Sequence, residues 1–108
     1  MISTMADLVI GSRPSRTFQL RSLNAAVNIT VYTVQGQLQS TTDGAPVLGP
    51  ITGVLSDAPA GKVRFDFPEL TASNTGGRDD GRIWRILVWT GTFAGVPNEI
   101  FEFNVRVR

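Results

Sequence analysis

The stretch Phe101-Glu102-Phe103-Asn104-Val105-Arg106-Val107-Arg108 alternates apolar and polar residues without a break up to the C-terminus. Successive side chains of a β-strand point to opposite faces, so this period of two predicts a strand with one buried face and one solvent-facing face. Because the sequence stops inside this strand, we expect residues 1–108 to form one complete small domain. We expect residues 1–10 to form an extended N-terminal arm.

The same alternation recurs in residues 16–21, 27–34 and 62–67, and glycine or proline residues separate these segments. Residues 83–89 are apolar on both parities, which is typical of a central strand that is covered on both sides or faces a partner on one side. No segment has a sustained helical period. About seven short strands separated by turns predict an all-β fold, an immunoglobulin-like antiparallel β-sandwich, with a small barrel as the rival.

The apolar positions of the alternating segments are predicted to face the core. They are Phe18, Leu20, Val27, Ile29, Val31, Val63, Phe65, Phe67, Ile86, Val88, Phe101, Phe103, Val105 and Val107. A domain of this length has room for one such core.

The composition argues against several classes of function. The sequence has 10 Lys and Arg against 9 Asp and Glu, a net charge of +1, no histidine and no cysteine. A balanced charge gives no electrostatic case for nucleic acid. Without histidine and cysteine, the commonest general base, thiolate catalysis, disulfides and the usual zinc ligands are excluded. No apolar run is long enough to span a bilayer. We therefore predict no enzyme activity, no metal and no cofactor.

Two acidic residues, Asp79 and Asp80, are the best candidates for carboxylate chemistry. Adjacent carboxylates in an extended segment point to opposite sides, so they are poorly placed to share a substrate. With Asn74 they offer oxygens to calcium, but the segment lacks the spacing of a calcium loop. Residues 71–81 are therefore interpreted as a long, irregular, solvated loop.

Three aromatic residues, Tyr32, Trp84 and Trp89, raise the possibility of a platform that stacks against sugar rings. The two tryptophans have opposite parity on one strand, so at most one of them faces solvent. The other is expected to be the core tryptophan of the sandwich.

Charged side chains concentrate on the predicted terminal strands and on the loop at residues 71–81. They form either a solvated face or a face that docks onto a partner, and surface ion pairs alone do not decide between the two. The candidate docking residues are Asn74, Arg78, Asp79, Asp80, Arg82, Arg85, Trp89, Glu102, Arg106 and Arg108.

The order of strands and turns resembles the N-terminal immunoglobulin-like domain of phage baseplate upper proteins. The resemblance runs through residues 16–20, 27–32, 41–47, 61–65 and 97–103. That family links receptor-binding or fibre proteins to a tail baseplate. Its domain normally continues into a fibrous C-terminal region, whereas this sequence stops, so the resemblance implies an accessory virion subunit.

We therefore expect a non-enzymatic structural or adaptor protein of a tailed-phage virion, which attaches tail, baseplate or fibre components to one another. Its expected partners are other virion proteins, in a homo- or hetero-oligomer, without nucleic acid, membrane or small-molecule ligand. It would be assembled into the virion in the host cytoplasm. The alternatives are a capsid decoration (cement) protein on the head surface and a carbohydrate-binding module.

Overall fold

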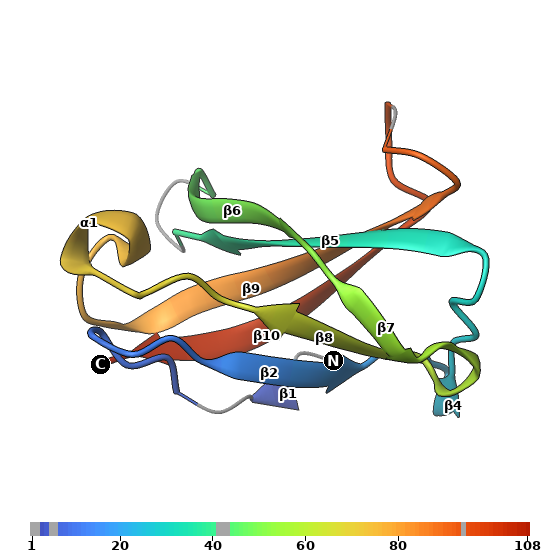
Figure 1. Ribbon diagram of the computed structural model, residues 1–108, viewed down its shortest axis with the longest axis horizontal. Helices are drawn as coiled ribbons and strands as arrows, with labels where there is room; N and C mark the ends of the chain where they lie inside the picture. Colours follow the sequence, from blue (N-terminus) through green and yellow to red (C-terminus); the bar gives the residue numbers. More distant parts are fainter. Residues whose placement is uncertain (1–2, 5–6, 41–43, 94) are drawn as a thin grey trace.

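The computed structural model describes residues 3–4, 7–40, 44–93 and 95–108, apart from the side chains of residues 3, 4, 79 and 80. Two sheets pack face to face (Figure 1). The larger sheet has the order β1 (Ser3–Thr4), β10 (Glu99–Val107), β9 (Asp79–Thr90), β5 (Tyr32–Gln39) and β6 (Pro46–Thr52). The smaller sheet has the order β2 (Ser15–Gln19), β8 (Lys62–Asp66) and β7 (Val54–Asp57).

Three short elements connect these strands. They are the hairpin of β3 (Arg21–Ser22) and β4 (Ala25–Ala26), the 3-10 turn η1 (Ala58–Ala60) and the helix α1 (Ala72–Thr75). None of the helices in the described ranges is long and apolar enough to cross a membrane.

The predicted immunoglobulin-like sandwich is confirmed by the strand order. Strands β5, β9 and β10 take the places of strands C, F and G, with β6 added at the edge, and β2, β8 and β7 take the places of B, E and D. The described residues form seven strands of four residues or more, as expected, and three of two residues. All neighbouring strands are antiparallel except β1, which runs parallel to β10.

The chain changes sheets at Gly53, between β6 and β7. The amide of Gly53 still donates to the carbonyl of Val34 in the larger sheet, at 2.9 Å. A Cβ atom at Gly53 would lie 2.4 Å from Cγ2 of Val63 in the smaller sheet. The crossing therefore needs a residue without a side chain, and Gly53 is that residue.

Aromatic rings fill the space between the sheets. Trp84 of β9 is fully buried, and its ring lies 5.1 Å from that of Phe65 and 4.8 Å from that of Phe67. Phe18 of β2 stacks on the same indole at 6.3 Å. In antibody domains a disulfide joins strands B and F at this place, whereas here the rings on β2 and β9 span it.

Most of the predicted core is confirmed. Ten of the fourteen positions are buried, namely Phe18, Leu20, Ile29, Val63, Phe65, Phe67, Ile86, Val88, Val105 and Val107. Val27, Phe101 and Phe103 are half-buried at the rim. The core also includes Leu8, Val34, Leu38 and Leu70, which the pattern did not predict, and Trp84, one of the two tryptophans of which at least one was expected there.

The assignment of Val31 to the core is wrong, because residues 27–34 are not one strand. The side chain of Asn28 accepts the amide of Thr30 at 3.0 Å, and this turn delays the strand until Tyr32. Val31 is left exposed, and Val34 takes the inward position.

The N-terminal segment packs along the last strand. The amide of Leu8 donates to the carbonyl of Arg106 at 2.9 Å, and the amide of Arg108 donates to the carbonyl of Leu8 at 2.8 Å. The side chain of Leu8 is fully buried. Residues 8–10 are thus part of the sandwich.

Candidate interaction surfaces

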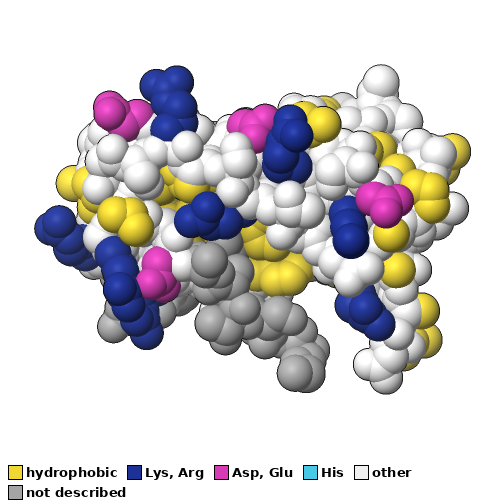
Figure 2. Space-filling model, turned by 60° about the horizontal axis from the view of Figure 1, so that its bottom comes forward, with side chains coloured by type: hydrophobic (Ala, Val, Ile, Leu, Met, Phe, Trp, Pro, Cys, Tyr) yellow, Lys and Arg dark blue, Asp and Glu magenta, His cyan; other side chains and the backbone are white. Residues whose placement is uncertain are grey.

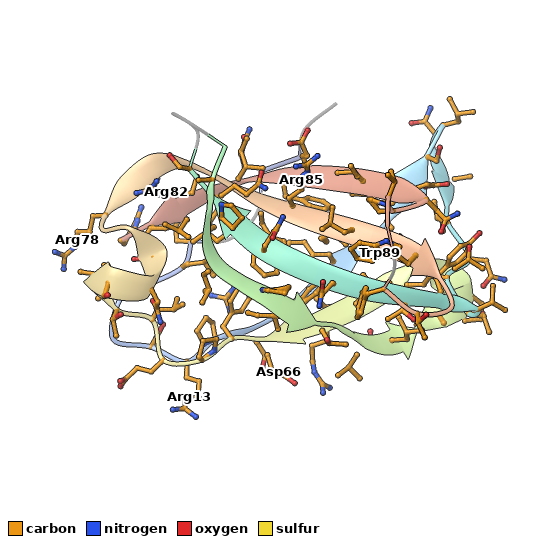
Figure 3. The ribbon with its side chains drawn as sticks, turned by 90° about the horizontal axis from the view of Figure 1, so that it is seen from above. Arg13, Asp66, Arg78, Arg82, Arg85 and Trp89 are labelled. Atoms are coloured by element: carbon orange, nitrogen blue, oxygen red, sulfur yellow. The ribbon has the colours of Figure 1, made fainter. Side chains whose placement is uncertain are left out.

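The structure separates the predicted docking residues into two groups. Arg85 and Trp89 on β9 and Glu102 and Arg106 on β10 share the outer face of the larger sheet. The others lie near α1 or at the C-terminus. Figure 3 shows Arg85 and Trp89 along β9, whereas Arg78 and Arg82 lie beside α1.

The outer face of the larger sheet combines a charged row with apolar neighbours. Arg85 lies opposite Glu102 of β10 and opposite Gln37 of β5. Ile83 and Leu87 flank Arg85 on the same face and are half-buried. The expectation that this strand is central is confirmed, since β9 lies between β10 and β5.

The two tryptophans lie on opposite faces of β9, as their parity predicted. Trp84 is in the core, and Trp89 on the outer face is only 9% exposed. Phe93 covers the Trp89 ring, in an edge-on contact with centroids 4.7 Å apart. Neither indole presents the open, flat surface on which a sugar ring stacks.

The interpretation of residues 71–81 as an irregular loop is wrong. The hydroxyl of Thr71 accepts the amide of Asn74 at 3.1 Å, and the side chain of Asn74 accepts the amide of Thr71 at 2.8 Å. This capping box starts α1, and only three residues separate the end of the helix from the start of β9. Thr75 is fully buried.

Asn74 and Arg82 have structural roles in this region. The side-chain amide of Asn74 also donates to the carbonyl of Glu69 at 2.9 Å. Arg82 is 9% exposed and donates to the carbonyl of Gly76 at 2.9 Å, so it ties β9 to the end of α1. Arg78 is exposed, and the backbone of Asp79 and Asp80 belongs to β9. The side chains of these two aspartates lie outside the described part of the chain.

At the C-terminus, Arg108 lies just beyond β10. Its Nε atom is 2.8 Å from a carboxylate oxygen of Asp7. This ion pair joins the last residue to the N-terminal segment. Glu102 and Arg106 are exposed on β10, as the alternation predicted.

A further surface, which the sequence did not suggest, lies at the opposite end of the sandwich from α1. We call it the loop end and define it by four exposed apolar side chains on three connections. They are Leu23 (97% exposed), Val31 (71%), Phe93 (37%) and Val96 (87%).

Hydrogen bonds hold these connections together at one end. The hydroxyl of Thr33 donates to the carbonyl of Gly91, which joins the start of β5 to the β9–β10 hairpin. The amide of Ile29 donates to the carbonyl of Ala58 in η1 at 2.9 Å. The β9–β10 hairpin and the β3–β4 hairpin both project from this end, on different sides (Figure 1).

The signal for the loop end was present in the sequence but was hard to read. Phe93 and Val96 stand among glycines and a proline, between the apolar residues 83–89 and the alternating residues 101–108. Bulky apolar residues in turns are informative because turns normally favour small and polar residues. The exposure of Val31 was not predicted, because the alternation of residues 27–34 placed this residue on the buried face of a strand.

The remaining chemistry is sparse. Among the side chains that the structure describes, no group of three or more acidic, histidine or cysteine residues is placed to hold a metal ion. Asp66 has a lowered pKa, because the hydroxyl of Ser15 donates to its carboxylate at 2.6 Å and Arg64 bonds to it as well. This cluster is exposed and joins β2 to β8.

No protein-family model, no curated protein and no solved structure significantly matches this chain.

Proposed function

We propose that this protein is a non-enzymatic attachment module that binds a protein partner through its loop end. Within this proposal it is a structural protein of a tailed-phage virion, and it connects tail, baseplate or fibre components. The observation that carries the proposal is the exposure of Leu23, Val31, Phe93 and Val96 on three connections at one end of a rigid sandwich.

Covering exposed apolar side chains is favourable, by about 25 cal/mol for each Å² that a partner removes from water. Single exposed apolar residues are common on protein surfaces. Four large ones on three connections at one end favour a surface that a partner covers. Loops held by a rigid sandwich commonly carry binding, and the corresponding end of antibody variable domains carries their binding loops.

The virion context rests on the resemblance to the baseplate upper domain, not on the fold alone, because one fold serves many functions. The attachment role agrees with that context. A position on the head surface, as a decoration protein, is a competing outcome of the test.

The test is incorporation into particles. A phage carrying a deletion of this protein would be complemented in trans with the wild-type chain, with Val31→Asp or with Val96→Asp. The matched control is Val54→Asp, where the valine is also exposed, at 46%, but lies in strand β7 and not on one of the three connections of the loop end.

We expect all four chains to fold, the wild type and the control to enter particles, and the two loop-end variants to be absent from them. Immunogold labelling then places the protein on the tail or on the head. Wild-type occupancy of both loop-end variants would refute attachment through the loop end. A wild-type protein absent from purified particles would refute the virion context.

A further inference from the structure

The β3–β4 hairpin has a leucine where its backbone disfavours one. Ser22 pairs with Ala25, so Leu23 and Asn24 form a two-residue hairpin loop. Their φ angles are 51° and 66°. Positive φ at both positions is the pattern of a type I′ turn, which favours Asn and Gly. Among the described residues, Leu23 and Asn24 are the two non-glycine residues with positive φ.

The leucine is also nearly free of contact, since 97% of its surface is exposed. Asparagine at this position would relieve both problems, because it tolerates the left-handed region and is polar. A strained backbone position is an observation from which a functional role can be inferred. We infer that Leu23 is present for a contact outside this chain.

Hydrogen bonds across the turn and at the base define the shape of the hairpin. A guanidinium nitrogen of Arg21 donates to the carbonyl of Asn24 at 2.8 Å, across the turn. At the base, the amide of Val27 donates to the carbonyl of Leu20 at 2.9 Å, and that of Leu20 donates to the carbonyl of Gly61 at 2.8 Å. All six residues from Arg21 to Ala26 are exposed. Figure 2 shows this part projecting from the lower right of the molecule.

A surface that fits the hairpin lies beside it on the same chain. The ring of Phe103 on β10 lies 5.0 Å from that of Phe18 on β2, so the inner face of β10 borders the strand from which the hairpin continues. Phe101 is the next inward residue towards the loop end and is half-buried. Figure 2 shows hydrophobic side chains on the surface next to the projection.

The charges of the two surfaces are complementary. In residues 20–31, Arg21 is the one charged side chain. At the start of β10, Glu99 lies on the same face as Phe101 and is exposed, whereas Glu102 lies on the outer face. A hairpin with a cation and an apolar tip therefore matches the start of the inner face of β10, which carries the apolar Phe101 and the carboxylate of Glu99.

We propose that two copies of this chain associate by exchanging these contacts about a twofold axis. Leu23 of each copy packs against Phe101 of the other, and Arg21 lies near Glu99. A twofold interface uses the same patch on both subunits, so each copy both gives a hairpin and receives one. A six-residue hairpin alone is small beside the ~800 Å² per partner of a standard interface. Reciprocal exchange uses two surfaces per copy, which favours a second copy over another partner.

The dimer is a property beyond the attachment function proposed above, and it can be tested with the purified chain alone. Sedimentation equilibrium over a wide range of concentration should show a reversible dimer. Leu23→Asn should weaken this dimer about tenfold or more, as expected for loss of a buried apolar anchor. Val96→Asn, which changes an exposed valine of the other hairpin, is the matched control and should leave the dimer unchanged.

A second readout separates contact from folding. Leu23→Asn should raise the denaturation midpoint measured at concentrations where the protein is monomeric, because it relieves the backbone. If Leu23 were present for folding, the same change would lower the midpoint. Exchanging the two charges tests the contact of Arg21 with Glu99 independently. Arg21→Glu and Glu99→Arg should each weaken the dimer, and the two changes combined should restore it.

A wild-type chain that stays monomeric at the highest concentration would overturn the proposal. So would a dimer that Leu23→Asn does not weaken. Both results leave the attachment function standing, because that function is tested by the entry of Val31 and Val96 variants into particles. If those variants did not change incorporation, the attachment function would be refuted, but the dimer proposal would still stand.

Discussion

Four aromatic residues on or beside three strands meet between the sheets and form the densest part of the core. Phe18 comes from β2, Phe65 from β8, Phe67 follows β8, and Trp84 comes from β9. Each ring touches Trp84. Such pairs add about 0.5–1.5 kcal/mol each beyond the area they bury. The cluster therefore joins the two sheets without a covalent link.

Replacing Phe65 with alanine should lower the free energy of unfolding by about 3–5 kcal/mol, the range for deletion of a packed aromatic side chain. Phe65 is fully buried and contacts both Phe18 and Trp84. Chemical denaturation monitored by tryptophan fluorescence measures the change. Phe93→Ala is the control, because Phe93 is 37% exposed and should cost much less. Equal losses in both variants would contradict this picture of the core.

The carboxyl group of Asp66 should titrate below the ordinary range of an aspartate. Its pKa is lowered first by the hydrogen bond from Ser15 and next by that from Arg64. A depressed folded-state pKa stabilises the fold above the unfolded-state pKa, and this contribution disappears as the pH falls through the folded-state value. Because the group is exposed, the effect on stability should be small.

Carbon-detected NMR titration of the Asp66 carboxyl group measures this pKa. Ser15→Ala should move it upward, towards the ordinary value, while Ser56→Ala on the exposed strand β7 should not. An unchanged titration in Ser15→Ala would show that this hydrogen bond does not hold the pKa down.

At the scale of single elements, the connection from α1 to β9 behaves as part of the fold. Asn74 closes the capping box, and Arg82 bonds to the carbonyl of Gly76. Removal of residues 74–80 would take away the cap, the acceptor of Arg82 and the first residues of β9. That deletion would therefore test folding and would give no information about docking.

Asn74→Ala should lower the free energy of unfolding by about 1 kcal/mol, as for other residues that cap a helix start. The change removes the bonds to the amide of Thr71 and to the carbonyl of Glu69. Ser73→Ala, at an exposed position of the same helix, is the control. Thermal or urea denaturation compares the two, and equal stabilities would show that the cap contributes nothing.

Gly36 sets the position of β5 against the core. A Cβ atom there would lie 2.2 Å from Cζ2 of Trp84, closer than any relaxed contact. Gly36→Ala should therefore destabilise the protein by about 1–3 kcal/mol or more, the cost of overpacking a dense core. The smaller ring of Trp84→Phe should reduce this cost. A double-mutant cycle of denaturation midpoints measures the coupling, and strict additivity would mean that the indole is not the obstacle.

At the scale of the whole molecule, stability should decline from the central strands to the periphery. Strand β9 lies between β10 and β5, and β8 lies between β2 and β7. The β3–β4 hairpin is exposed along its length and pairs only with itself in the described chain. Native-state hydrogen exchange should be slowest for amides of β5, β8 and β9, and fastest in this hairpin. Exchange at one uniform rate throughout would instead indicate that the sandwich opens only as a unit.

The two ends of the molecule are built differently, and this bears on the proposed attachment. The C-terminus and α1 share one end (Figure 1), where Asn74 and Arg82 are committed to internal bonds. The loop end exposes apolar side chains instead. An attachment module with this arrangement would bind at the loop end and leave the α1 end to the fold.

The sequence by itself determined the class of fold and the strands with a strict period of two. In β8 and β10 the alternation predicted both the strand and its buried face, because side-chain direction follows from local backbone geometry. It also showed that Trp84 and Trp89 lie on opposite faces of one strand.

Only the tertiary structure decided which of those faces is the core, because that depends on where the other sheet packs. The start of β5 was likewise set by the pairing of Tyr32 with Thr90, far along the chain. Residues 27–31 alternate in the same way, but they form no strand because they do not pair with β9. The exposure of Leu23, Val31, Phe93 and Val96 follows from the same cause. A local pattern determines how side chains alternate, but burial is a contact between distant segments and is decided only when they pack.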